Sequence, residues 1–151
     1  MRIEQTNAFS DLKACAAIWL EASIAAHTFI APDFWARNHT AMLEEYLPAS
    51  DVYVAKTQST IVGFAAIHDC VLAALFVDPA EWGKGIGSEL IRYTKDKYAK
   101  LELAVYTSNA RALRFYRQHG FVLQEERICP HTGEPELLMS WYQQKPLHTS
   151  G

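Results

Sequence analysis

Three glycines at alternate positions form the part of this chain best suited to bind an anion. Gly83, Gly85 and Gly87 follow an apolar run over residues 73–77 and surround the start of a helical pattern at Ile86. The first turn of a helix leaves backbone N–H groups without partners and carries partial positive charge, so a phosphate can bind there. Glycine removes the side chains that would keep a phosphate away. The segment therefore predicts a site for a phosphorylated small molecule.

Two common phosphate-binding motifs do not fit the spacing. A P-loop has four residues between its first Gly and a Gly-Lys-Ser/Thr sequence, whereas here Gly85 follows Lys84 and no hydroxyl residue is placed to hold magnesium. A dinucleotide-binding Gly-x-Gly-x-x-Gly comes directly off a strand, but Ser88 replaces its third Gly and five residues separate Val77 from Gly83. Taken alone, the glycines favour a tight turn that uses them only for geometry.

A second segment, residues 109–121, makes the pattern more specific. It reads Asn-Ala-Arg-Ala-Leu-Arg-Phe-Tyr-Arg-Gln-His-Gly-Phe, and residues 82–87 read Trp-Gly-Lys-Gly-Ile-Gly. Together the two segments resemble the GNAT superfamily of N-acetyltransferases, which use acetyl-CoA. The first family motif is Arg/Gln-x-x-Gly-x-Gly/Ala. The second is Asn-x-x-Ala-x-x-Phe-Tyr closed by Gly-Phe, and it is matched by Asn109, Ala112, Phe115, Tyr116, Gly120 and Phe121. The resemblance spans most of the chain and is weakest in the first half.

Two positions depart from the family pattern. Trp82 stands where the first motif has Arg or Gln, which removes one side-chain contact to the pyrophosphate and leaves the backbone contacts. Gln118 stands where such helices often carry Lys. Lys84, Arg114 or Arg117 could replace that contact to the nucleotide phosphate.

The resemblance also implies where CoA lies. The strand over residues 71–77 would diverge from the strand over residues 101–106, and the pantetheine arm would fill the notch and pair with backbone groups as an added strand does. The pyrophosphate would lie on the amides of residues 83–88. The residues expected to contact the cofactor are Leu75, Phe76, Val77, Trp82, Gly83, Lys84, Gly85, Ile86, Gly87, Ser88, Asn109, Ala112 and Phe115.

The implied reaction is attack of a neutral amine on a thioester. A lysine-like amine has a pKa near ~10.4, so few molecules are neutral at pH 7. The departing thiolate benefits from a proton donor, and the family pattern assigns that role to Tyr116. Backbone N–H groups near Leu75 and Phe76 would stabilise the oxyanion.

The general base is not determined by the motifs. His27 leads the candidates, because it lies in a loop where family members line the acceptor pocket and because Phe29, Trp35 and Tyr46 could form a pocket wall. The alternatives are His68 with Asp69, Glu102, or a base acting through water. Each of these side chains could also be purely structural. No pair of histidines has the spacing of metal ligands, so no metal is expected.

Composition agrees with one cytoplasmic globular domain. The chain has 151 residues, of which 50% are hydrophobic and 12% aromatic, with a net charge of -3. It has no Lys/Arg-rich run that would indicate nucleic acid, no apolar run of the ~18 residues needed for a membrane span and no signal peptide. Three widely spaced cysteines indicate reduced thiols.

The hydrophobic patterns predict an α/β (α+β) fold. We expect a GNAT-like mixed, mostly antiparallel sheet of about seven strands with helices on both faces and a splayed CoA notch. Ser10 should cap the first helix, one helix should run from Pro32 to about Tyr46, and the glycine-started helix should reach about Ala99. Asn109 or Ser108 should cap the helix that ends at Gly120. The domain should cover residues 1–143, with a flexible tail over 144–151.

The sequence therefore predicts an acetyl-CoA-dependent N-acetyltransferase that acts on a primary amine. One alternative is a non-catalytic acyl-CoA-binding or sensor module on the same fold. Another is a different acyl donor such as succinyl-CoA. The acceptor, a small molecule or a protein amine, and the oligomeric state remain open.

Overall fold

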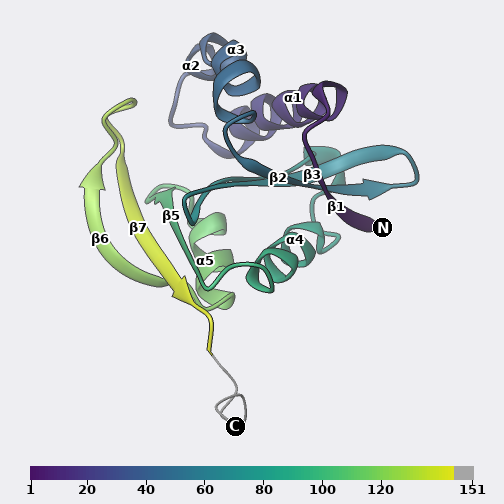
Figure 1. Cartoon of the computed structure of the whole chain (residues 1–151). Coiled ribbons are helices and arrows are strands. Elements are labelled where there is room, and N and C mark those ends of the chain that lie inside the picture. Colours follow the sequence, from purple (N-terminus) through teal and green to yellow (C-terminus); the bar gives the residue numbers. More distant parts are fainter. Residues whose placement is uncertain (145–151) are drawn as a thin grey trace, which may run out of the picture.

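A seven-stranded sheet in the order β1-β2-β3-β4-β5-β7-β6 forms the centre of the molecule (Figure 1). The computed structural model describes residues 1–144, so the expected tail lies outside the described residues apart from its first position. The strands are β1 (Arg2–Thr6), β2 (Asp51–Thr57), β3 (Thr60–His68), β4 (Val71–Val77), β5 (Lys100–Tyr106), β6 (Val122–Ile128) and β7 (Pro135–Tyr142). All neighbouring pairs are antiparallel except β4 and β5, which are parallel.

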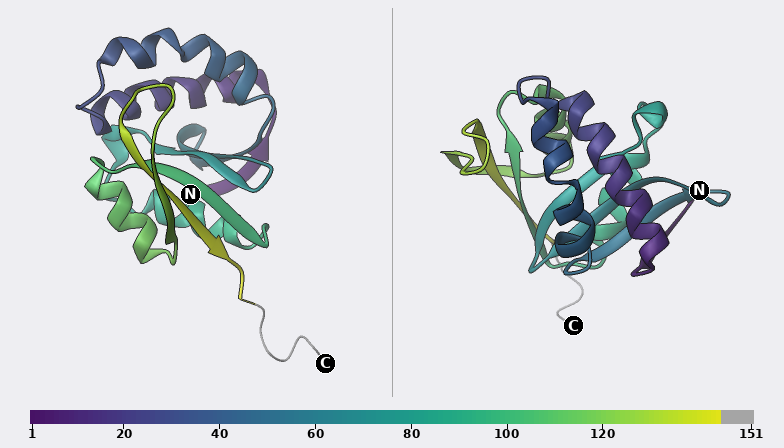
Figure 2. Two further views of the ribbon diagram at one scale, coloured as in Figure 1. Left: turned by 90° about the vertical axis from the view of Figure 1, so that its left-hand side faces the viewer. Right: turned by 90° about the horizontal axis from the view of Figure 1, so that it is seen from above.

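Helices cover both faces of this sheet, as Figures 1 and 2 show. One face carries α1 (Phe9–Ala26), α2 (Pro32–Arg37), α3 (His39–Ala41) and the π-helical turn η1 (Met42–Tyr46). The other carries α4 (Ile86–Lys95) and α5 (Ala110–Gln118), and a short 3-10 turn, η2 (Pro79–Glu81), precedes α4. Each face has its own apolar core, one centred on Phe64 and Trp19 and the other on Leu90 and Leu101. The predicted mixed sheet with helices on both faces is confirmed.

Strands β4 and β5 meet only where they begin. Among the described residues their register has a single pair, Val71 with Glu102, and the Glu102 N–H donates to the Cys70 carbonyl at 2.9 Å. Parallel strands that stayed paired would need hydrogen bonds along their whole length. Beyond this pair the two strands diverge, and the facing edges are free to contact something other than each other.

A bulge in β4 decides which side chains face which core. In the pairing with β3, Ala66 opposes Ala74 while Ile67 opposes Leu72, so Ala73 is an extra residue. Leu72 consequently packs in the core under α4, whereas Ala74, only two positions later, packs in the core under α1. A bulge re-aims the side chains that follow it, and here it sets the orientation of the second half of β4.

Three of the predicted helix boundaries are wrong. Ser10 does not cap α1: the residue before the helix is Ala8, two positions earlier, and it makes no side-chain cap hydrogen bond. The Thr6 hydroxyl accepts from the Ala8 N–H at 3.2 Å. The helix expected after Pro32 is interrupted, because the Asn38 N–H bonds to carbonyls two and three residues back and the chain then forms a π turn. Helix α4 ends at Lys95 instead of Ala99.

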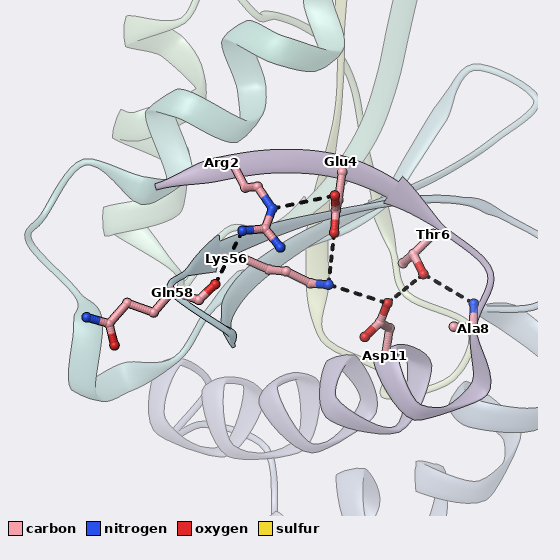
Figure 3. Close-up of polar contacts among 7 residues, drawn as sticks. All are labelled: Arg2, Glu4, Thr6, Ala8, Asp11, Lys56 and Gln58. Carbon is pink, nitrogen blue, oxygen red and sulfur yellow. Dashed lines mark hydrogen bonds and ion pairs between the residues drawn. The ribbon is translucent and has the colours of Figure 1, made fainter.

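Lys56, a largely buried lysine on β2, links the start of α1 to the edge strand β1 (Figure 3). The Lys56 ammonium lies 2.8 Å from Glu4 on β1 and 3.9 Å from Asp11 on α1, with only 16% of its side chain exposed. Thr6 donates to the same Asp11 carboxylate at 2.7 Å. The pairing with Lys56 lowers the pKa of Glu4 below its usual value. These contacts fix where α1 leaves the sheet.

Replacing Lys56 by Met should lower the melting temperature at pH 7 by about 2–4 °C, because Glu4 and Asp11 lose the ammonium that contacts both. Glu4 then keeps only Arg2, which lies 3.6 Å away. Glu4 has a lowered folded-state pKa, so its contribution is present above its unfolded pKa and is lost as the pH falls through the folded pKa. The gap between the parent and Lys56→Met should therefore shrink in thermal melts at acidic pH. A gap that stayed constant with pH would contradict this pairing.

Candidate active site

A cleft of about 290 Å³ opens where β4 and β5 diverge. Four elements supply its walls: the end of β4, the glycine segment before α4, the start of α5, and two small residues of α1. The lining residues are Ala22, Ala26, Leu75, Phe76, Val77, Glu81, Trp82, Gly83, Gly85, Ile86, Gly87, Ser88, Asn109, Arg111, Ala112, Phe115 and Tyr116. The sequence-predicted site residues are therefore brought together here, with the exceptions of Lys84 and His27.

The glycine segment leaves open space at its surface. Gly83 and Gly85 have φ values of 86° and 80°, and a Cβ atom on either would meet no other atom within 4 Å. Gly85 is the residue before the first turn of α4, whose early N–H groups have no helical acceptor. This combination of bare backbone, free donors and empty space forms a cradle that fits a phosphate group.

Asn109 fixes the start of α5 and connects it to α1. Its Oδ1 accepts from the Ala112 N–H at 3.2 Å, which is the N-cap contact that the sequence predicted. Its Nδ2 lies 3.3 Å from His27 Nε2. Because Nδ2 can only donate, His27 Nε2 must accept, and the ring is then neutral with its proton on Nδ1. The position of α5 therefore depends on a residue at the end of α1.

His27 is enclosed by aromatic rings and does not line the cleft. It is 6% exposed, stacks on Trp35 at 5.1 Å between centroids and meets Tyr106 edge-on at 5.2 Å. Burial lowers the pKa of His27. Nδ1 makes no hydrogen bond within the described residues. A neutral ring whose Nε2 is already occupied suits a positioning role better than proton abstraction.

Tyr116 lies on the cleft side of α5 with its hydroxyl free. Its ring packs edge-on against Phe115 at 5.3 Å and Phe121 at 5.6 Å between centroids. The hydroxyl makes no hydrogen bond to any residue in the described part of the chain. Burial raises the pKa of Tyr116 well above its ordinary value. The phenol is therefore protonated near neutral pH.

The remaining predicted residues lie outside the cleft. The Lys84 ammonium points to Glu81 at 3.1 Å. His68 and Asp69 line a second, apolar hollow with Trp19 and Tyr46, on the face that α1 covers. Glu102 is half exposed and lies 3.5 Å from Lys100. None of these side chains shares the cleft with Tyr116.

Four cleft residues were not predicted from the sequence, namely Ala22, Ala26, Glu81 and Arg111, and of these four only Arg111 carries a positive charge that would attract a phosphate. Arg111, the second residue of α5, lines the cleft with its guanidinium 4.9 Å from the centroid of the Trp82 ring. The sequence offered a signal, since Trp82 replaces Arg or Gln, Gln118 replaces Lys, and Arg111 lies inside the second motif. Only the fold places it beside Trp82.

Two further features bear on the class of protein. No helix within residues 1–144 combines the length and apolar character needed to cross a membrane. In the same part of the chain, no three His, Cys, Asp or Glu side chains gather in the way that metal ligands do.

Comparison with known proteins decides the family. A family model described as "Acetyltransferase (GNAT) domain" matches residues 48–123, about half of the chain. Over 133 residues the chain is 32% identical to peptidyl-lysine N-acetyltransferase YiaC of Escherichia coli (strain K12), covering 87% of this chain and 91% of the relative. The chain belongs to the GNAT acetyltransferase family. It is an N-acetyltransferase, as its motifs predicted.

Other GNAT proteins agree with this assignment. The chain is 30% identical over 125 residues to peptidyl-lysine N-acetyltransferase YjaB of Salmonella typhimurium, covering 82% of this chain and 86% of that protein. The apo form of YjaB from Escherichia coli has the same fold, with a TM-score of 0.79 at 23% identity over 92% of this chain and 95% of that one. So does yncA from Salmonella typhimurium, solved with its cofactor acetyl-CoA, with a TM-score of 0.68 at 18% identity over 97% and 95%.

Alanine substitutions at Gly85 and Gly87 test the backbone conformation of the glycine cradle. Gly85→Ala should reduce the free energy of unfolding by about 1–2 kcal/mol, because an L-residue is forced into the left-handed region. Gly87→Ala should be close to the parent, since its Cβ would meet Phe115 at 3.5 Å, an ordinary contact, and alanine favours the helix. Urea denaturation measures both. Equal stability of Gly85→Ala and the parent would contradict the described turn.

Proposed function

We propose that the cleft binds acetyl-CoA and that the protein transfers the acetyl group to a primary amine, a peptidyl lysine, by direct attack on the thioester. One observation carries this: the glycine cradle, the free edge of β4 and the unbonded Tyr116 hydroxyl all face one cleft. The lysine acceptor is supported by the relatives, which are named peptidyl-lysine N-acetyltransferases.

The proposed position of CoA follows from the cleft walls. Its pyrophosphate would accept from the N–H groups of residues 83–88, over the open space above Gly83 and Gly85. The pantetheine arm would pair with β4 where β5 has diverged. The Val77 carbonyl already accepts from the Trp82 Nε1–H at 2.8 Å. The Asp78 N–H donates to the Val62 carbonyl, so by the alternation of an antiparallel ladder the backbone groups of Phe76 also face β3. Pairing with the arm would therefore use the backbone groups of Leu75 and the N–H of Val77.

The chemistry then needs two proton movements. The neutral amine nitrogen bonds to the thioester carbon, and N–H groups near Leu75 and Val77 stabilise the oxyanion. As the C–S bond breaks, the Tyr116 hydroxyl gives its proton to the CoA sulfur. The proton that the amine loses leaves through water. Burial keeps Tyr116 protonated at the start of each cycle.

A thiol-release assay tests this function. We expect acetyl-CoA to be consumed with lysine peptides whose N-termini are blocked, and mass spectrometry should place the added acetyl group on the lysine side chain. Peptides with a free N-terminus and no lysine, polyamines and free amino acids serve as comparisons. No release with any amine would contradict transferase activity, and release with N-terminal amines alone would contradict the lysine assignment.

Tyr116→Phe tests the proton donor, because it removes one oxygen and keeps the ring packed against Phe115 and Phe121. We expect kcat to fall by ~10²–10⁴-fold while the affinity for CoA changes little. Because burial raises the pKa of Tyr116, the parental rate should show no fall from its ionisation between pH 7 and 9. A Phe variant with the parental kcat, under conditions where chemistry limits the rate, would leave Tyr116 as a wall of the cleft only.

Replacement of His27 separates a base from a positioning residue. His27→Gln keeps a neutral acceptor for Asn109 Nδ2, whereas His27→Ala removes it. If His27 positions α5, the Gln variant should retain most of the parental kcat/KM and the Ala variant should lose about tenfold or more. If His27 is the base, the two variants should be equally impaired, and the acidic limb of the pH–rate profile should disappear in both.

A further inference from the structure

Trp82 lines the cleft at the motif position where the family carries Arg or Gln. Its Nε1–H donates to the Val77 carbonyl at 2.8 Å, which ties the indole to the end of β4. The ring is half-buried and lines the cleft directly before Gly83. The indole therefore forms a rigid flat surface beside the glycine cradle.

The Arg111 side chain lies over the Trp82 ring. Its guanidinium lies 4.9 Å from the centroid of the Trp82 ring, a distance at which a cation is attracted to an aromatic face. Within residues 1–144 no carboxylate lies within 4.0 Å of Arg111. The one acidic side chain that lines the cleft, Glu81, is paired with Lys84. The cleft mouth thus carries an unpaired, held cation.

We propose that Arg111, held over Trp82, supplies the side-chain cation that binds the pyrophosphate of acyl-CoA. This inference rests on the proposed function of the cleft. Two residues would then together replace the Arg or Gln of the family motif. Arg111 of α5 supplies the charge, and Trp82 of the glycine segment supports its side chain.

The chemistry of arginine explains why this arrangement suits a pyrophosphate. A guanidinium can stack on an aromatic ring with its plane and still present N–H groups at its edge to two phosphate oxygens. Trp82, Gly83, Gly85 and Arg111 line the same cleft, so the edge donors and the free amides of α4 can meet the same anion. A side chain already held in place loses less conformational entropy when the ligand binds.

Calorimetric titration of the intact protein with three ligands tests the assignment. The ligands are CoA, dephospho-CoA, which keeps the pyrophosphate and lacks the 3′-phosphate, and pantetheine, which has neither. Arg111→Ala should weaken CoA and dephospho-CoA by about tenfold or more, and pantetheine should bind as in the parent. Arg92→Ala is the matched control: it removes an exposed arginine of α4 that pairs with Glu89 outside the cleft, and it should leave all three affinities unchanged.

Two further variants test the role of Trp82. Trp82→Ala should weaken CoA binding less than Arg111→Ala, because the charge remains and only its support is lost. Arg111→Ala combined with Trp82→Arg should recover part of the lost affinity, since a cation returns beside the cradle. Circular dichroism of each variant confirms that it is folded before its affinity is compared.

Each remaining outcome identifies what has failed. If the parent binds CoA and folded Arg111→Ala binds it equally well, the Arg111 assignment is wrong while the proposed function stands. If Arg111→Ala weakens CoA but leaves dephospho-CoA unchanged, the arginine contacts the 3′-phosphate and the pyrophosphate assignment is overturned. If the parent binds none of the three ligands, the proposed function falls and this inference falls with it.

Discussion

The parting of β4 from β5 is the constraint on which the site depends. The two parallel strands share one registered pair at their beginnings, Val71 with Glu102, and then separate. Separation leaves backbone groups on β4 without strand partners, which is costly unless water or a ligand satisfies them. The bulge at Ala73 adds to this by re-aiming the second half of β4. The cleft is therefore a consequence of strand geometry, and side chains only complete it.

The wall opposite β4 is held in place from two directions. At its start, α5 is capped by Asn109, which His27 of the α1 end holds in turn. At its end, His119 bonds through Nε2 to Ser88 of α4 at 3.0 Å, and Lys95 donates to the His119 carbonyl. The proton donor that we propose, Tyr116, needs a fixed position to be effective. Contacts from both neighbouring helices give α5 that fixed position.

The sequence predicted the features that depend on local chemistry. The continuous apolar run over residues 71–77 is a central strand, and Asn109 caps α5. Both were predictable because a buried strand and a helix cap are each recognisable from a few consecutive residues. The sequence could not predict features that need the fold. The π turn after Ala41 replaces a continuous helix, α1 begins after Ala8 without a side-chain cap, and Arg111 reaches Trp82 from a distant segment.

The most direct test of this account is an amide NMR titration of the ¹⁵N-labelled protein with CoA. The largest shifts are expected at the amides of residues 83–88 and of Leu75 and Val77 on β4. Small shifts are expected in β1, β2 and the second hollow beside Tyr46. Saturating shifts confined to another surface, or no shifts at millimolar CoA, would contradict the claim that the diverging strands form the cofactor site.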